Sequence, residues 1–271
     1  MAGFFGIGDF TKEGPGIEKN GPEKKKFVVF FETFFRNFWK FIPINLLFIG
    51  ICLPFFTNGL SYVGYTHVAR NTARDKHSFG VSDFFETIKK NWKQALALGV
   101  INTVVMLIIA IDIYFFNMMQ GNVAILGLGI ALASLVVFSF MKYYVWTFAI
   151  TFKFSISQIL KNSFKFAFIN IKKNALVGII LLAFYALVAV IALYLPLPFS
   201  IIFALLLLVC VFPGFKSLLV QYCTFDVIRK FIIDPYYEKH PDDDIELRLS
   251  LGLDVPEKYR YHDDFEEQEN V

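Results

Sequence analysis

The stretch "FIPINLLFIGICLPFFTNGLSYVGYTHVAR" (41–70) begins like a lipid-facing helix and then changes character. Its first part is almost entirely apolar, whereas Pro, Thr, Asn, Gly, Ser, Tyr, His and Arg crowd the second part. Polar, irregular backbone at membrane depth persists only where protein or a water-filled cavity covers it. The sequence therefore predicts a break near Pro54 and Gly59, and a polar segment that faces the interior of a helix bundle.

The composition places the chain among polytopic membrane proteins. Of its 271 residues, 56% are hydrophobic and 18% are charged, and the mean hydropathy is +0.55. Soluble domains have about 45–50% apolar and about 25% charged residues. The three cysteines lie in or beside hydrophobic runs and lack the spacing of metal ligands, so we expect neither a metal nor a cofactor.

Basic residues predict how the chain crosses the membrane. Hydrophobic runs occupy about 38–56, 95–116, 123–141, 175–195 and 197–215. Short loops rich in Lys and Arg remain cytoplasmic, and such residues both precede the first run and follow residue 70. Residues 58–70 must then return the chain across the bilayer. We expect an all-α transmembrane bundle of six inserted helices, one of them short and broken, with both termini cytoplasmic in a plasma membrane.

Charge divides the chain into three parts. We expect a cytoplasmic N-terminal lead over 1–37, a transmembrane domain over 38–233 and an acidic cytoplasmic tail over 234–271. The tail holds 13 acidic and 4 basic residues, against 10 and 22 in the remainder. An acidic, aromatic-poor segment buries too little apolar surface to fold, so the tail is expected to be disordered. The lead has no apolar core, and we expect no signal peptide.

Two similar segments each precede a crossing: "FGVSDFFETIKKN" (79–91) and "FSISQILKNSFKFAFINIKKN" (154–174). Each places apolar residues on one helical face and lysines on another, which is typical of an amphipathic helix in the membrane interface. Ser82 and Ser157 are the predicted N-caps. A parallel duplication and a chance similarity both account for the match. The basic residues expected at the interface are Arg70, Lys89, Lys90, Lys93, Lys161, Lys165 and Lys172.

The polar residues of the bundle have two interpretations. They form either a tight hairpin whose polar groups satisfy one another or the lining of a functional cavity. Asp112 is the acidic residue within a predicted crossing, and it is either a site at the outer mouth or an edge residue hydrated at the interface. Lys142 and Lys216 lie near inner helix ends, where snorkelling explains them. The candidate cavity residues are Asn45, Thr57, Asn58, Ser61, Tyr62, Tyr65 and Asp112.

The order of these motifs resembles the YesL-like bacterial membrane proteins. That family has an Asn in its first helix, then Pro-x-x-Thr-x-Gly-x-Ser, a short aromatic-containing helix, a basic residue and a Phe-rich helix. The resemblance covers about 27–100 well and is looser to 233. It implies a bacterial plasma-membrane protein of unknown biochemical function and suggests a link to carbohydrate uptake. The matching residues are Asn45, Pro54, Thr57, Gly59, Ser61, Tyr65, Arg70, Phe84, Phe85, Asn91 and Trp92.

Two function classes follow from the sequence. Signatures of metalloproteases, serine hydrolases and P-loop enzymes are missing, and the lysines lie beside membrane helices, where anionic lipid is a nearer partner than nucleic acid. We therefore expect a non-catalytic accessory or scaffold protein of a sugar-uptake system, with the lipid bilayer as its surroundings. The alternative is a small-solute channel or transporter whose path is lined by residues 53–70 and Asp112.

Overall fold

The computed structural model describes residues 25–76, 78–240 and 245, and these residues form helices and connecting turns without a strand. The all-α class is therefore confirmed for the described residues. In chain order the elements are α1 (Lys26–Arg36), α2 (Phe38–Cys52), the 3₁₀ turn η1 (Phe55–Thr57), α3 (Asn58–Ala73), α4 (Val81–Met118), α5 (Asn122–Thr151), α6 (Ile156–Ile169), α7 (Ile171–Tyr194), α8 (Phe199–Leu206), the π segment η2 (Leu207–Val211), α9 (Phe212–Ile228), the π segment η3 (Arg229–Ile233) and α10 (Asp234–Lys239).

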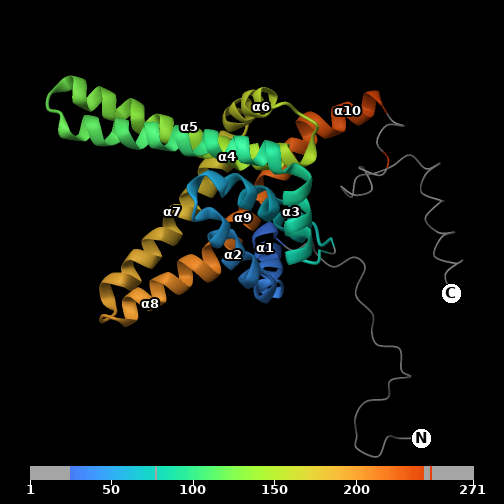
Figure 1. The fold of residues 1–271 in the computed structure, drawn as a ribbon, viewed down its shortest axis with the longest axis horizontal. Coiled ribbons are helices and arrows are strands. Elements are labelled where there is room, and N and C mark those ends of the chain that lie inside the picture. The colour runs from blue at the N-terminus through green and yellow to red at the C-terminus, as the bar shows by residue number, and fades with distance from the viewer. Residues whose placement is uncertain (1–24, 77, 241–244, 246–271) are drawn as a thin grey trace, which may run out of the picture.

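Among the described residues, four helical segments are long and apolar enough to cross a membrane: α4, α5, α7 and the continuous segment Phe199–Lys239. Within their apolar windows only 17–22% of the residues are buried, so most of these side chains face outward, as expected of helices surrounded by lipid. Figure 1 shows that the α4–α5 hairpin and the α7–α8 hairpin project in different directions from a central group formed by α1, α2, α3 and α9. The described part of the chain is thus all-helical, and it has the long apolar helices of a membrane protein.

The predicted number of six inserted helices exceeds these four. Helix α2 has 15 residues, which at 1.5 Å per residue is about 22 Å and less than a bilayer core of about 30 Å. Helix α3 has 16 residues, and its sequence is polar. Neither helix has the length and composition of a spanning helix, so insertion of this pair remains a proposal.

Helix α3 is the most enclosed element of the bundle, although its sequence is polar. Ten of its 16 residues are buried, and α2, α4, α5 and α9 all pack against it. The neighbouring helices cover its polar groups, as the principle for polar backbone at membrane depth requires. The prediction that this segment faces the bundle interior agrees with its burial.

Two glycines allow α3 and α4 to approach closely. Gly59 lies inside α3, not in a break, and a Cβ atom at this position would overlap the backbone of α4, coming within 2.8 Å of the Gly99 nitrogen. A Cβ on Gly99 would likewise lie 2.7 Å from the Gly59 nitrogen. The break itself lies at residues 53–57, around Pro54, and Gly59 follows it as the second residue of α3. Small residues permit this type of close helix crossing in membranes.

The first predicted interfacial helix is not a separate element. Residues 81–118 form one continuous helix, because no proline or glycine interrupts the sequence from Val81 to Leu98. The second segment does form a separate amphipathic helix, α6, which ends at Ile169 with Asn170 as its C-cap. The N-caps also differ from the prediction: Gly80 precedes α4, and Ser155 caps α6 in a capping box with Gln158. The two similar segments therefore have different local structures.

Helix α1 is an amphipathic helix that lies within the predicted N-terminal lead (1–37). Its buried residues are Phe30, Thr33 and Phe34. The rings of Phe30 and Phe34 lie 5.5 and 5.7 Å from the ring of Phe215 on α9, both in edge-on arrangements. Residues 26–36 are therefore packed against the bundle, although the sequence assigned them to a lead outside it.

Reporter fusions test the orientation of the membrane helices. The turn at 119–121 and the turn at 195–198 carry no charged residue, and both hairpin tips point away from the central helices (Figure 1). Because uncharged short loops are the ones that are exported, fusions at residues 120 and 197 are expected to report the outside. Fusions at 76, 163 and 240 are expected to report the cytoplasm. An outside signal at 163 would contradict this orientation.

Candidate functional site

The polar residues of the break hold the turn between α2 and α3. The Thr57 hydroxyl donates to the carbonyl of Ile51, and the Asn58 side-chain amide donates to the Thr103 hydroxyl of α4 at 2.7 Å. The Asn102 side-chain amide donates to the side-chain oxygen of Asn58, Oδ1, at 3.3 Å. The hydrogen-bond partners of these two predicted cavity residues are therefore the backbone of the turn and the side chains of α4, as in the hairpin interpretation.

Asn45 and Tyr65 form a buried polar link between α2, α3 and the irregular start of α9. The Tyr65 hydroxyl donates to Asn45 Oδ1, and Asn45 Nδ2 donates to the carbonyl of Cys210 at 2.6 Å. Cys210 belongs to the π segment that precedes Pro213, where the regular helical hydrogen-bond ladder is interrupted. Asn45 thus satisfies a backbone carbonyl in the interior, and its role in the structure is to join helices.

A cavity of about 230 Å³ lies between α3, α5, α7 and α9. This volume holds roughly eight water molecules, each of which occupies about 30 Å³ in the liquid. Three of its walls come from helical segments that are long and apolar enough to cross a membrane: α5, α7 and the segment that contains α9. Its lining residues are Tyr62 and Thr66 of α3; Ser139, Lys142, Tyr143 and Trp146 of α5; Leu181 and Tyr185 of α7; and Phe212, Lys216, Ser217, Val220 and Gln221 of α9.

Two buried side chains present polar atoms without a protein partner at this cavity. Trp146 and Gln221 are only 4% and 3% exposed. The Trp146 ring nitrogen and Gln221 Oε1 have no hydrogen-bond partner among the described residues. Gln221 Nε2 donates to the Thr147 hydroxyl at 2.8 Å, which fixes the amide. Buried polar groups in proteins are normally paired, so the unpaired donor of Trp146 and the unpaired acceptor of Gln221 stand out among the residues that line the cavity.

Lys142 and Lys216 give the cavity its charge. Lys142 Nζ lies 3.7 Å from the Met106 sulfur and 5.6 Å from the centre of the Phe138 ring, and Lys216 Nζ lies 5.7 Å from the centre of the Tyr62 ring. These ring distances are close to the 6 Å limit for cation–π attraction. Among the described residues neither lysine forms an ion pair, and none of the lining residues is acidic.

Sequence reasoning attributed both lysines to snorkelling and did not place them in a site. Snorkelling would carry each ammonium outward along its own helix, whereas the structure turns both toward one cavity. The available signal was the polar character around Lys142, where Ser139 and Trp146 lie one turn before and after it on the same helical face. Of the predicted cavity residues, Tyr62 is the one that lines this space, and Thr66 joins it from the next turn of α3.

The remaining predicted residues lie elsewhere. Asp112 is exposed in the last two turns of α4, and it is not among the residues that line the cavity. Ser61 is fully buried in α3. The structure therefore does not bring Asp112 together with residues 53–70.

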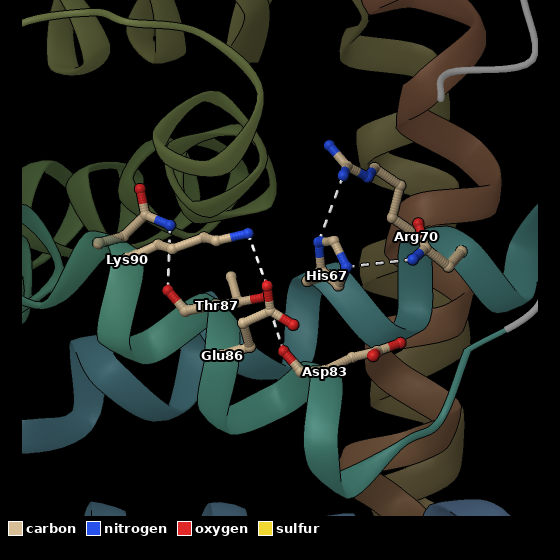
Figure 2. Close-up of polar contacts among 8 residues, drawn as sticks. His67, Arg70, Asp83, Glu86, Thr87 and Lys90 are labelled. Carbon is tan, nitrogen blue, oxygen red and sulfur yellow. Dashed lines mark hydrogen bonds and ion pairs between the residues drawn. The ribbon is translucent and has the colours of Figure 1, made fainter. Parts of the chain in front are cut away.

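Arg70 was expected at the membrane interface, but it is buried because α4, α5 and α9 enclose its helix. Its guanidinium donates to the Thr151 hydroxyl at 2.9 Å and lies 3.4 Å from His67 Nδ1. Figure 2 shows His67 between Arg70 and the start of α4, where Asp83 and Glu86 are located. The other predicted interface residues are exposed, and Lys90 pairs with Glu86 at 2.6 Å; they are Lys89, Lys90, Lys93, Lys161, Lys165 and Lys172.

A second cavity, of about 220 Å³, adjoins Arg70 and Arg74. Burial, followed by the charges of Arg70 and Arg229, lowers the pKa of Arg74 to about 9. At the rim, Lys26 pairs with Asp226 at 3.0 Å, and this hydrogen bond raises the pKa of Lys26. Gln221 lines this cavity as well as the first, so its side chain stands between the two.

The fold and the cavity define a helical membrane protein with a polar, cationic interior site. A family described as "Protein of unknown function, DUF624" matches residues 41–113, which run from α2 through most of α4. No curated protein and no solved structure matches the chain. Within the described residues, no group of three or more His, Cys, Asp or Glu side chains could hold a metal ion.

Proposed function

We propose that the protein is a non-catalytic accessory protein of a bacterial carbohydrate-uptake system, and that it binds a small polar solute in the cavity between α3, α5, α7 and α9. The observation that supports solute binding is this cavity, which has polar lining residues and lies within an apolar bundle. Polar and ionisable groups inside a membrane domain are costly, and they commonly mark a functional site. The link to carbohydrate rests on the resemblance to YesL-like proteins, as do the plasma membrane and the scaffold role.

The lining suits a hydroxylated solute. The rings of Tyr62 and Trp146 stack 4.8 Å apart and nearly parallel, and they form a rigid aromatic wall. The hydroxyls of Thr66, Ser139 and Ser217 add groups that both donate and accept hydrogen bonds. Ligand sites typically combine aromatic walls with a few placed polar groups.

A transporter or channel is the second candidate. It is favoured by Gln221, which lines both the membrane cavity and the cavity beside Arg70. A path through the two cavities would pass Tyr62 but not Asp112. It therefore differs from the path predicted from the sequence, which includes Asp112 at its outer end.

Binding and uptake measurements with the full chain distinguish these functions. We expect saturable binding of a member of a panel of monosaccharides and sugar acids by protein in lipid nanodiscs, followed through Trp146 fluorescence. Tyr62→Ala is expected to weaken that binding at least tenfold, a loss of about 1.4 kcal/mol. The control Tyr194→Ala removes a tyrosine that is 83% exposed and should leave binding unchanged.

The same panel is then offered to proteoliposomes. Binding without uptake supports the accessory function, whereas uptake that Gln221→Leu alters supports the transporter. If no compound either binds or is taken up, the cavity is not a solute site and the proposed function is wrong.

A further inference from the structure

Two positive charges face the membrane cavity, and no acidic side chain of the described residues lines it or pairs with them. Lys142 comes from α5 and Lys216 from α9, and both line the same space of about 230 Å³. Lys142 lies beside the Met106 sulfur and the Phe138 ring, and Lys216 lies beside the Tyr62 ring; none of these groups carries a charge. Charges in protein interiors are normally paired, because removal from water is costly without compensation.

From this arrangement we infer that the cavity binds a small organic anion, whose carboxylate or phosphate group lies between Lys142 and Lys216. This inference rests on the proposed solute-binding function and adds the chemical class of the solute. A bound anion would supply the missing counter-charge, and its attraction to two ammonium groups is strong where little water is present.

The other unpartnered groups indicate where the rest of the ligand lies. The Trp146 ring nitrogen can only donate, so it suits a second oxygen of the anionic group or a neighbouring hydroxyl. Gln221 Oε1 can only accept, so it requires a hydroxyl or another donor on the ligand. Both atoms are buried and unpartnered among the described residues. One anionic group together with at least one hydroxyl would satisfy the site.

Anion binding and a purely structural role of the two lysines predict opposite effects of their substitution on the melting temperature. If the lysines hold the helices together, replacing either of them should lower the melting temperature. If instead the two ammonium groups repel each other in the ligand-free protein, Lys142→Met or Lys216→Met should raise the melting temperature in buffer without ligand. Methionine has a similar length and no charge, so the substitution leaves the packing volume nearly unchanged. Lys172→Met, at an exposed position, is the matched control and should have no effect.

Ligand binding is measured with three probes of similar size and different charge: sodium glucuronate, glucose and glucosamine. Trp39 and Trp92 are 79% and 51% exposed, whereas Trp146 is 4% exposed. Full-length protein that carries Trp39→Phe and Trp92→Phe therefore reports through Trp146 alone. At constant ionic strength we expect glucuronate to bind at least tenfold more tightly than the other two. Each Lys→Met substitution at the cavity should remove most of that preference, while Lys172→Met should retain it.

The outcomes separate this inference from the function on which it rests. If glucose and glucuronate bind equally well and neither cavity substitution changes their binding, the inference of an anionic ligand is wrong, whereas the proposed solute binding is still supported. A lower melting temperature in both cavity variants would assign the lysines a structural role and also overturn the inference of an anionic ligand. No response of Trp146 to any of the three probes would count against the solute site itself.

Discussion

Gly59→Ala is expected to be the most damaging single substitution in the membrane bundle, with a cost of about 3 kcal/mol, the upper end of the usual range for overpacking. The added methyl group would overlap the backbone of α4 near Ala95 and lie within 2.8 Å of the Gly99 nitrogen. Backbone atoms cannot rotate away as a flexible side chain does, so α3 and α4 would have to separate. The melting temperature and the yield of folded protein after detergent extraction measure the effect.

Gly50→Ala and Gly129→Ala are the matched controls for this substitution. Both glycines lie in helices, and a Cβ atom at either position meets nothing within 4 Å. Alanine is a better helix former than glycine by about 1 kcal/mol in water, so these variants should be as stable as the parent or slightly more stable. If Gly59→Ala were as stable as Gly129→Ala, the close crossing of α3 and α4 would be wrong.

The coarse fold was predictable from the sequence because it depends on local composition. Long apolar runs predicted the spanning helices, and Pro54 predicted the break after α2. The polar stretch 58–70 could be assigned to the interior because lipid cannot satisfy polar groups. The continuity of α4 is not predicted, because the amphipathic segment 79–91 and the apolar run 95–116 differ in composition, although nothing between them interrupts helical hydrogen bonding.

The candidate site was less predictable, because helices distant in sequence meet there. Tyr62 and Lys216 are more than 150 residues apart in the chain, and no local pattern indicates that they share a cavity. Lys142 in isolation fits snorkelling as well as it fits a ligand site. Asp112 attracted attention as an acidic residue in an apolar run, yet the helix hairpin that holds it extends beyond the rest of the bundle (Figure 1). Whether each of these side chains reaches the cavity depends on which side of its helix faces the bundle interior. Tertiary packing sets this orientation, and the local sequence does not.

Substitutions at Asn45 are expected to have the next largest effect. Asn45→Ala removes the donor to the Cys210 carbonyl and the acceptor of the Tyr65 hydroxyl. Two buried polar groups then lose their partners, at about 1–3 kcal/mol for each unsatisfied group. Membrane proteins recover part of such losses, since interhelical hydrogen bonds within bilayers average about 0.6 kcal/mol. We therefore expect a total loss of about 2 kcal/mol, measured as a shift of the unfolding midpoint in detergent.

Tyr65→Phe separates the two halves of this link. It removes only the hydroxyl and leaves the contact between Asn45 and the Cys210 carbonyl, so it should cost about 0.6 kcal/mol. The double variant Asn45→Ala/Tyr65→Phe should lose less than the sum of the single variants, because the second change removes a hydroxyl that the first has already left without its acceptor. Tyr194→Phe, at an exposed tyrosine, should be neutral. Strict additivity at positions 45 and 65 would show that the two side chains act independently, and the polar link between α2, α3 and the start of α9 would then contribute nothing to holding the bundle together.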